Sequence, residues 1–287
     1  MRTPKNTLLR LIKTTLLLLT LLTQPIFAWD STGHRVISAI AYDHLTPNAK
    51  KTVDALTAIS DPGYPPLMRF LYTSTLPDKW RQHDHGQSAA WHFIDTPWST
   101  DETPTRPAAA PNLVDSLQTN QSLLKNPLAT NAEKSTALAY VIHLTEDAHQ
   151  PLHCIDRFSR AFPQGDKGGN LFPIRTKYAD NLHSYWDQSA RQMQPNKRYP
   201  FNHKQVLQLA KAIQADYPKS TFGEAADNFS VSDWVRESEK IAEQKVYDIT
   251  PGSTPSASYK SMQQTLAAGQ MALSGYRLAG LLNQLFR

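Results

Sequence analysis

The stretch HLTEDAHQPLH, at residues 143–153, constrains this chain more than any other part of it. His143 and Asp147 are four residues apart, so a helix would present both side chains on one face, one turn apart. Pro151 has no N–H to donate and crowds the preceding turn, so it should end the helix and bring His153 round beyond it. Two imidazoles and a carboxylate on a rigid element are typical zinc ligands. The alternative is a helix whose polar residues lie on a solvated face.

A second pair with the same spacing favours the metal interpretation. His183 and Asp187 are also four residues apart and lie in another segment with a helical pattern. Facing helices that each carry ligands are how bundle proteins assemble metal clusters.

Apolar residues recur at helical spacing along most of the chain beyond residue 28, and almost nothing alternates with the period of a strand. The sequence therefore predicts a mainly α fold, a single-domain multi-helix bundle with sites between helices and on long loops. Ser31 or Thr32 should cap the first helix, and Thr46 the second. The expected helices span residues 31–45, 47–59, 67–75, 113–124, 133–150, 182–193, 206–217, 231–246 and 258–286.

Three other segments lack helical periodicity. Residues 78–112 form a long loop, and its aromatic side chains indicate that the loop is packed and functional. The pattern predicts a glycine-rich turn at residues 165–170 and a short hairpin or irregular strand at residues 171–178. The aromatic residues of the long loop are Trp80, Trp91, Phe93 and Trp98.

The first 28 residues have the layout of a secretory signal. A positive start is followed by the apolar run 16–22, a polar break at residues 23–24, and Ala28 as the residue before cleavage. The alternative is an N-terminal membrane anchor, but the apolar run is shorter than the ~20 residues that span a bilayer. We therefore expect a signal peptide at 1–28 and one domain at 29–287. The basic residues of the start are Arg2, Lys5, Arg10 and Lys13.

The formal charge of +5 belongs mostly to this leader. Without its four basic residues, the chain has 26 Lys+Arg against 25 Asp+Glu, which is no evidence for an electrostatic nucleic-acid footprint. The single cysteine, Cys154, excludes an intramolecular disulfide, and we expect it to be a partly buried, inert thiol.

Six short motifs occur in order along the chain: WDSTGH, LPDKWR, WHFID, HLTEDAHQPLH, GGN and NLHSYWD. With them the chain resembles the zinc-dependent, single-strand-specific nucleases of fungi and plants, the S1/P1 nuclease family. That family has bacterial members and is related in fold to bacterial zinc phospholipases C. The resemblance spans nearly all of the chain after residue 28, and the tail GYRLAGLLN is similar to the family's last helix.

The resemblance implies three zinc ions held by nine residues, and every position carries a suitable ligand type. Trp29 would bind through its α-amino group and carbonyl oxygen, and that amino group exists only after cleavage behind Ala28. The resemblance places Asp78, His92, His143 and Asp147 on one zinc, Trp29 and His34 on a second that shares Asp147, and His153, His183 and Asp187 on the third. The remaining histidines, His44, His83, His85, His149 and His203, match no ligand and are expected to be structural or solvated.

The resemblance also implies catalytic roles for two residues. Asp147 would bridge two zinc ions that activate a shared water for attack on phosphorus, lowering its pKa to about 7. Arg81 matches an arginine that meets the transition state, where its planar fork can pair with two phosphoryl oxygens.

Three residues are expected to contact substrate. Phe93 matches the residue that stacks on the base beside the cleaved bond. Asp95 matches a carboxylate that either contacts the base or orients the attacking water. Lys167 lies where fungal members tend to have an apolar partner for the base, so it could reach base or phosphate. After Asp95 the chain reads TPWSTDETPTRP, unlike the fungal pattern, which leaves further contacts open.

These expectations describe an exported zinc endonuclease, periplasmic or secreted and of bacterial type. Its substrates would be single-stranded DNA and RNA, cut to 5′-phosphate products, and nucleotides through a 3′-nucleotidase activity. No stable membrane association after signal cleavage and no protein partner are expected. The alternatives are a zinc phospholipase C with the same metal framework and a zinc-binding protein without catalysis. The HFID sequence with Phe93 favours nucleic acid.

Overall fold

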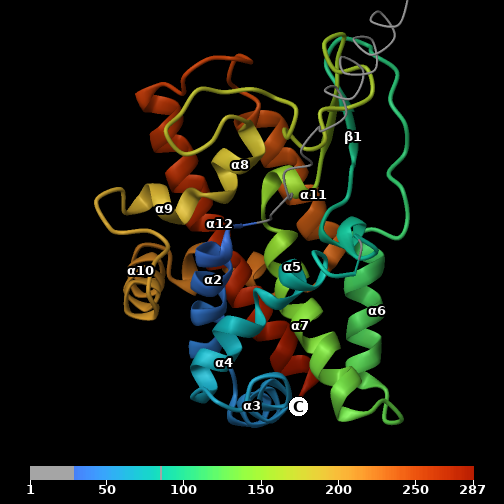
Figure 1. Ribbon diagram of the computed structural model, residues 1–287, viewed down its shortest axis with the longest axis vertical. Coiled ribbons are helices and arrows are strands. Elements are labelled where there is room, and N and C mark those ends of the chain that lie inside the picture. Colours follow the sequence, from blue (N-terminus) through green and yellow to red (C-terminus); the bar gives the residue numbers. More distant parts are fainter. Residues whose placement is uncertain (1–28, 85) are drawn as a thin grey trace, which may run out of the picture.

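The computed structural model describes residues 29–84 and 86–287, so the expected signal peptide and His85 lie outside the described residues. The described chain is mainly helical, with two strands of three residues each (Figure 1). The expected fold class, a mainly α multi-helix bundle, is confirmed. The longer helices are α2 (Ser31–Asp43), α3 (Pro47–Ser60), α4 (Pro66–Thr73), α6 (Leu113–Lys125), α7 (Asn131–Asp147), α10 (His203–Asp216), α11 (Val231–Ile241) and α12 (Ala257–Leu285).

Shorter elements connect these helices. They are α5 (Leu76–Trp80), η1 (Ala89–His92), β1 (Pro97–Ser99), η2 (Pro151–His153), β2 (Asp156–Phe158), α8 (Leu182–Asp187), α9 (Ser189–Met193), η3 (Lys219–Asp227) and η4 (Ala242–Val246).

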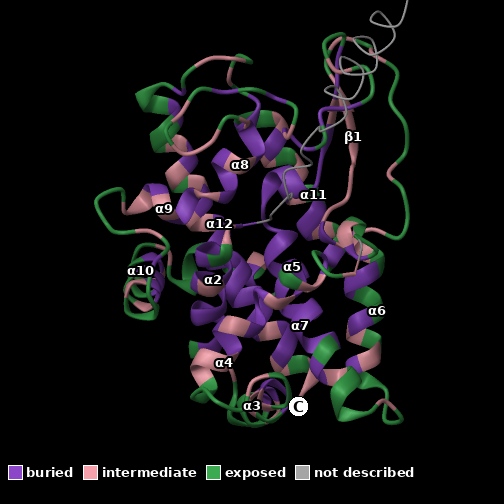
Figure 2. Cartoon of the chain, viewed as in Figure 1, coloured by how far each residue is buried: buried purple, intermediate pink, exposed green. Residues whose placement is uncertain are grey.

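Two helices form the centre of the molecule. Residues 137–150, in α7 and just beyond it, are all buried, as are residues 270–279 of α12. Figure 2 shows these buried residues gathered at the middle of the molecule, while α6 and α10 expose their outer faces. α12 packs against α2 and α7. A helix buried on all sides is normally apolar all round, yet α7 carries His143, Glu146 and Asp147 into this interior.

The start of α2 is capped one residue earlier than expected. The carboxylate of Asp30 accepts hydrogen bonds from the backbone N–H of Thr32 at 2.9 Å and of Gly33 at 3.0 Å. The prediction of Ser31 or Thr32 as the cap was therefore wrong, because both residues are already inside the helix. The expected Thr46 cap of α3 is confirmed.

α7 ends at Asp147 and not at residue 150. The hydrogen bonds that follow its end are of the 3-10 type. The N–H groups of His149 and Gln150 donate to the carbonyls of Glu146 and Asp147, three residues back. Pro151 then begins the 3-10 turn η2. The chain consequently turns before the proline, and the helix ends on a residue expected to be a ligand.

Other expected helices are divided. The segment 182–193 breaks at Gln188 into α8 and α9, and 231–246 continues beyond α11 as the π-helical turn η4. The helix expected over 67–75 ends at Thr73, and Pro77 lies inside α5. In 171–178 the structure has only a bridge between Pro173 and Asn181, which is closer to the irregular alternative.

The expected loop at 78–112 contains α5, η1 and β1, so it is partly regular. β1 pairs in parallel with β2, with Pro97 opposite Asp156. The N–H of Ile94 donates to the carbonyl of His153 at 2.8 Å. These bonds fix the part of the loop that follows His92 against the turn that follows α7.

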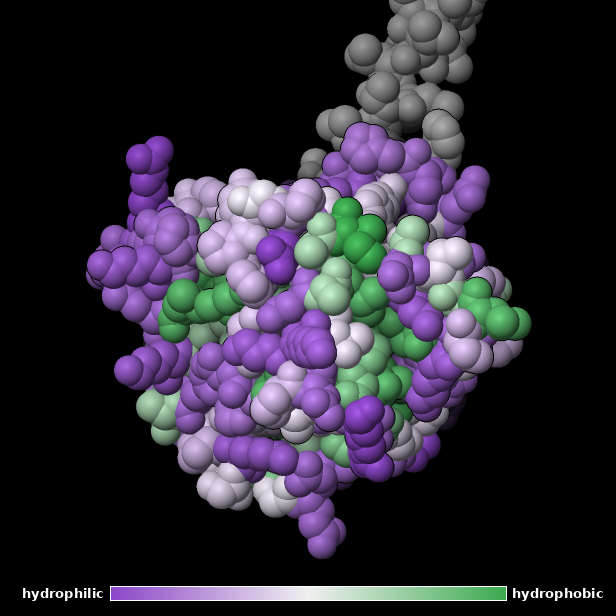
Figure 3. All heavy atoms as spheres, turned by 90° about the horizontal axis from the view of Figure 1, so that it is seen from below, coloured by the Kyte–Doolittle hydropathy of each residue, from purple (hydrophilic) through white to green (hydrophobic). Residues whose placement is uncertain are grey.

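No helix among the described residues has the length and apolar character needed to span a bilayer. Seen from below, the molecule shows hydrophilic residues over most of its face, with apolar residues in groups between them (Figure 3).

Candidate metal centre

The nine residues expected to bind metal come together at the centre of the fold. They are carried by α2, α5, η1, α7, η2 and α8, and by the residue that precedes Asp30. None exposes more than 6% of its surface: Trp29, His34, Asp78, His92, His143, Asp147, His153, His183 and Asp187.

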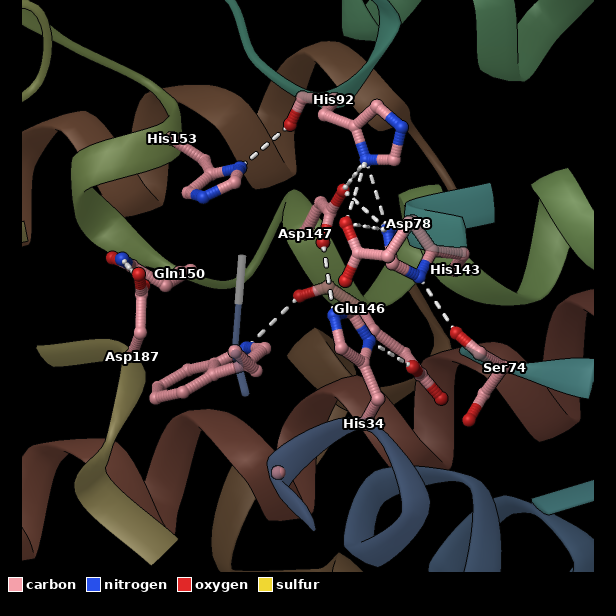
Figure 4. Close-up of polar contacts among 12 residues, drawn as sticks. His34, Ser74, Asp78, His92, His143, Glu146, Asp147, Gln150, His153 and Asp187 are labelled. Carbon is pink, nitrogen blue, oxygen red and sulfur yellow. Dashed lines mark hydrogen bonds and ion pairs between the residues drawn. The ribbon is translucent and has the colours of Figure 1, made fainter. Parts of the chain in front are cut away.

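The first cluster joins α5, η1 and α7 (Figure 4). The Nδ1 atom of His92 lies 2.9 Å from Nε2 of His143, and these nitrogens lie 3.2 and 3.3 Å from Oδ2 of Asp147. Oδ1 of Asp78 is 3.9 Å from the His92 nitrogen and 3.8 Å from the His143 nitrogen. Tetrahedral zinc, with bonds of about 2.0–2.2 Å, places its ligand atoms about 3.3–3.6 Å apart. The four side chains therefore have close to the right spacing.

The second cluster shares Asp147 with the first. Its Oδ1 atom lies 3.5 Å from Nε2 of His34, while its Oδ2 atom faces the first cluster. His34 Nε2 and Asp147 Oδ1 are both buried without a hydrogen-bond partner. The ring of His34 stacks on that of His143 at 4.1 Å, so His143 also borders this site. One carboxylate thus faces two sites with different oxygens, as a bridging ligand would.

Trp29 borders the second cluster with a buried side chain. Its indole Nε1 donates to the carbonyl oxygen of Glu146 at 3.1 Å. The following residue, Asp30, donates its N–H to the carbonyl of Asp187 at 3.0 Å. These bonds hold the segment against α7 and α8. Coordination through the α-amino group of Trp29 stays a prediction.

The third cluster joins η2 and α8. The Nε2 atoms of His153 and His183 lie 3.1 Å apart, and Oδ2 of Asp187 is 3.6 Å from the His183 nitrogen. In the view of Figure 4, His153 and Asp187 lie to one side of Asp147, and Asp78 and His143 to the other.

Hydrogen bonds made by the Nδ1 atoms of His143, His183 and His153 fix the tautomers of these three histidines. The Nδ1–H of His143 donates to the carbonyl of Ser74 at 2.6 Å, and the Nδ1–H of His183 donates to the carbonyl of Gly168 at 2.7 Å. His153 Nδ1 likewise donates to a backbone carbonyl, at 2.6 Å. Because a carbonyl can only accept, each Nδ1 carries the hydrogen and each Nε2 presents a lone pair. In the third cluster the two imidazole lone pairs face each other beside the Asp187 carboxyl group. A cation would satisfy all three groups, so the residues fit metal ions.

Burial and neighbouring charges shift the pKa values of the clusters in both directions. Burial alone would lower the pKa of His143, but the nearby carboxylates, Asp147 first, outweigh it and raise that pKa above its usual value. Burial lowers the pKa of His34 and of His153, which keeps both imidazoles neutral. Burial raises the pKa of Asp147, but the nearby imidazoles outweigh it, His143 first, and hold that pKa well below its usual value. Asp187 differs, because burial raises its pKa well above normal. A bound cation would reverse that shift.

Arg81 lies beside the first cluster. It is the C-cap of α5 and is 8% exposed, and its guanidinium lies 3.3 Å from Oδ1 of Asp78. Arg81, which is expected to bind phosphate, therefore lies against Asp78, which is expected to bind metal.

The three predicted substrate residues line one cavity of about 270 Å³, the Phe93 cavity. Phe93, Asp95 and Lys167 share it with His183 of the third cluster. Asp95 is mostly screened from water, and burial together with the Asp156 carboxylate raises its pKa to about 6. The cavity thus adjoins the metal centre.

A family model described as S1/P1 Nuclease matches residues 29–287. The chain belongs to the S1/P1 nuclease family. It is 24% identical to Endonuclease 4 of Arabidopsis thaliana over 94% of this chain and 93% of that protein. It is 26% identical to Endonuclease 2 of the same plant, over 91% of each. Nuclease P1 of Penicillium citrinum is 26% identical over 55% of this chain and 57% of its own length.

Membership of the S1/P1 nuclease family confirms the expected relationship and makes this protein a nuclease. Its substrate class is nucleic acid. The buried His and Asp clusters are groups that could hold metal ions.

Glu146 is a site residue that sequence reasoning missed. It is fully buried and accepts hydrogen bonds from Nδ1 of His34 at 2.5 Å and from the hydroxyl of Ser38 at 2.6 Å. Burial, with the charge of Asp147 beside it, raises the pKa of Glu146 well above normal. Carboxylates that bond the outer nitrogen of a ligating histidine fix its orientation. The signal was present, since Glu146 lies inside the motif, but a carboxylate that orients a ligand looks the same in sequence as one that binds.

Three further contacts were missed. The amide of Gln150 donates to Oδ1 of Asp187 at 2.7 Å. Arg106 and Asp156 line the Phe93 cavity. Arg106 comes from the stretch that departs from the fungal pattern, so sequence comparison offered no role for it.

The described histidines that were expected to be structural or solvated, His44, His83, His149 and His203, lie outside the three clusters. His149 is buried and bonds Arg277 at 3.0 Å, and His44 bonds Gln214 at 2.9 Å. Cys154 is a free, fully buried thiol whose pKa burial raises, as expected of an inert one.

Proposed function

We propose that this protein is an exported, zinc-dependent endonuclease that hydrolyses single-stranded DNA and RNA to 5′-phosphate products, with 3′-nucleotidase activity on mononucleotides. One observation carries the proposal. Buried imidazoles and carboxyl groups come together in three clusters that could each hold a cation, beside a cavity lined by the aromatic ring of Phe93. Metal-assisted phosphodiester hydrolysis accounts for both features.

Three zinc ions would be held by the nine expected ligands, with Asp147 shared between two of them. Imidazole and carboxylate ligands suit zinc. The chemistry that zinc supplies in such sites is a water with a pKa of about 7 and charge stabilisation at phosphoryl oxygens. The protein's own task is to hold the phosphate there, and Arg81 is placed for this because its guanidinium lies beside Asp78.

The Phe93 cavity would hold the nucleoside on the 5′ side of the scissile phosphate. Its volume of about 270 Å³ has room for one nucleoside, near the lower end of small-ligand cavities at about 300 Å³. A base can enter only after leaving its stack, which explains a preference for single strands. Asp95 is in place to accept hydrogen bonds from base N–H groups, and Lys167 to approach a phosphate.

Residues 1–28 would be the signal peptide and residues 29–287 the single catalytic domain. Cleavage behind Ala28 would create the α-amino group with which Trp29 completes the second site. The same signal peptide would direct export to the periplasm or medium.

The purified 29–287 protein should be assayed on single-stranded DNA, single-stranded RNA, duplex DNA and phosphatidylcholine. We expect cleavage of both single strands to 5′-phosphate ends, loss of activity with a chelator, and recovery with zinc. Lipid turnover without nucleolysis would instead indicate a phospholipase C, and metal binding without hydrolysis would contradict catalysis altogether.

A further inference from the structure

A second cavity reaches the metal-ligand clusters. This cavity, here called the Tyr199 cavity, has a volume of about 390 Å³, and Asp78 of the first cluster and Asp187 of the third both line it. No described residue lines both the Tyr199 cavity and the Phe93 cavity. Its other walls include Asp30, Lys79, Gln82 and Tyr199. Two separate spaces therefore open onto the same group of ligands.

The structure of a phosphodiester suggests what the Tyr199 cavity could bind. Each internal phosphate of a nucleic acid is joined by two ester bonds to two nucleosides, one on its 5′ side and one on its 3′ side. The Phe93 cavity has room for one nucleoside, and its contact with the metal centre is His183. A phosphate held among the clusters would need a second cavity for its other nucleoside. The Tyr199 cavity adjoins the candidate ligands and is larger than the Phe93 cavity.

The lining of the Tyr199 cavity suits a nucleoside. Tyr199 is partly buried and offers an aromatic ring, and the guanidinium of Arg191 lies 4.9 Å from its centroid. Aromatic faces bind any base by stacking. Lys79 and Gln82 are exposed at this cavity and add a cation and an amide.

The carboxylates of this cavity need not repel the substrate. Asp78 and Asp187 would be neutralised by the cations they hold. Asp30 is occupied, because one oxygen accepts the N–H groups that start α2 and the other accepts the hydroxyl of Tyr199.

We propose that the Tyr199 cavity binds the nucleoside on the 3′ side of the scissile phosphate, an inference that rests on the proposed nuclease function. A nucleoside 3′-monophosphate fills the Phe93 cavity and the phosphate site alone. A dinucleoside monophosphate also fills the Tyr199 cavity. Contacts in the Tyr199 cavity therefore contribute to kcat/KM for the dinucleoside monophosphate and not to that for the mononucleotide.

The test follows both substrates, which share the 5′-side nucleoside and the bond that breaks but differ in the 3′-side nucleoside and in the charge of the phosphate. Each variant is therefore compared with the wild-type enzyme on the same substrate. Tyr199→Ala should lower kcat/KM for the dinucleoside monophosphate about tenfold, the size of one lost stacking contact. Hydrolysis of the 3′-mononucleotide and zinc content should be unchanged. Tyr199→Phe, the matched control, keeps the ring and loses only the hydroxyl, so it should retain the wild-type kcat/KM for the dinucleoside monophosphate.

Gln82→Trp provides a second variant at an exposed position. Its indole would fill part of the cavity and should also lower only dinucleoside hydrolysis. A parallel fall in kcat/KM for both substrates in the two variants overturns the proposal, and so does no fall for either substrate. An enzyme that hydrolyses neither substrate contradicts the nuclease proposal instead.

Discussion

Asp147 is the residue on which two of the three clusters depend. One of its oxygens faces His34 and the other faces His92 and His143. It is also the last residue of α7, where backbone and ligand positions are fixed together.

We predict that Asp147→Ala loses zinc from the first and second sites together and reduces hydrolysis to background. The reason is that the remaining imidazole lone pairs lose their shared anionic partner. Metal analysis of the purified variant checks this. Full zinc content with near-normal hydrolysis would refute a bridging role.

Glu146→Gln tests the orientation of His34. The variant keeps the shape but replaces the carboxyl group that accepts the His34 N–H, so zinc affinity or activity should fall by about 10–100-fold. Chelator competition measures this affinity, and Ser38→Ala is the control because it leaves the carboxylate in place. Unchanged affinity in Glu146→Gln would mean that the group is neutral and acts only as a spacer.

At the scale of elements, ligands are held by turns as much as by helices. The turn at 165–170 has positive φ at Gly165, Lys167, Gly168 and Gly169. Within it the carbonyl of Gly168 accepts the Nδ1 hydrogen of His183. The backbone conformation of the turn therefore orients a ligand of the third cluster.

Gly168→Ala should weaken the third site. The added Cβ would lie 2.2 Å from the carbonyl oxygen of Leu152, at a φ of +57°, so the turn must shift. We expect a loss of about 1 kcal/mol or more in unfolding free energy and reduced zinc occupancy. Gly252→Ala is the control, with φ of +75° and open space around it. Equal zinc content in both variants would contradict a role for this turn.

Helix positions could be predicted from sequence, but several of their ends could not. Asp30 caps α2 while its own N–H is bonded to the carbonyl of Asp187 in α8, a tertiary contact that local sequence does not report. α7 ends earlier than expected, at Asp147, and the turn that follows brings His153 to a different cluster.

The site divides in the same way. The two His-x-x-x-Asp pairs and His153 could be proposed as ligands from their types and spacings, whereas the family resemblance was needed to place His34, Asp78 and His92 beside them. Glu146, Arg106 and Tyr199 could not be predicted, because their positions depend on segments that meet only in the fold. Tyr199 lies in 194–202, a connection between α9 and α10 without periodicity, and reaches the site through Asp30.

At the scale of the whole molecule, the three clusters of candidate ligands join helices from both halves of the chain. α2, α5, α7 and α8 each carry candidate ligands, and α12 packs behind α2 and α7. Cations held by these buried groups would link the helices to one another.

Removal of metal should therefore lower thermal stability. A ligand at 1,000 times its Kd contributes about 4 kcal/mol to folding, and each kcal/mol moves Tm by about 2–4 °C in a domain of this size. We expect a chelator to lower Tm by roughly 10 °C for each site that is emptied. Calorimetry with and without zinc measures this, and an unchanged Tm would show that the clusters do not hold stabilising metals.

The central claim is a three-zinc site that is completed by the amino group of Trp29. Native mass spectrometry of the exported protein tests it most directly, because one spectrum gives both the N-terminal mass and the number of bound metals. The expected result is a chain that begins at Trp29 and carries three zinc ions, with fewer in a precursor in which cleavage is blocked. Three zinc ions in the uncut precursor, or fewer than three in the chain that begins at Trp29, would contradict the claim.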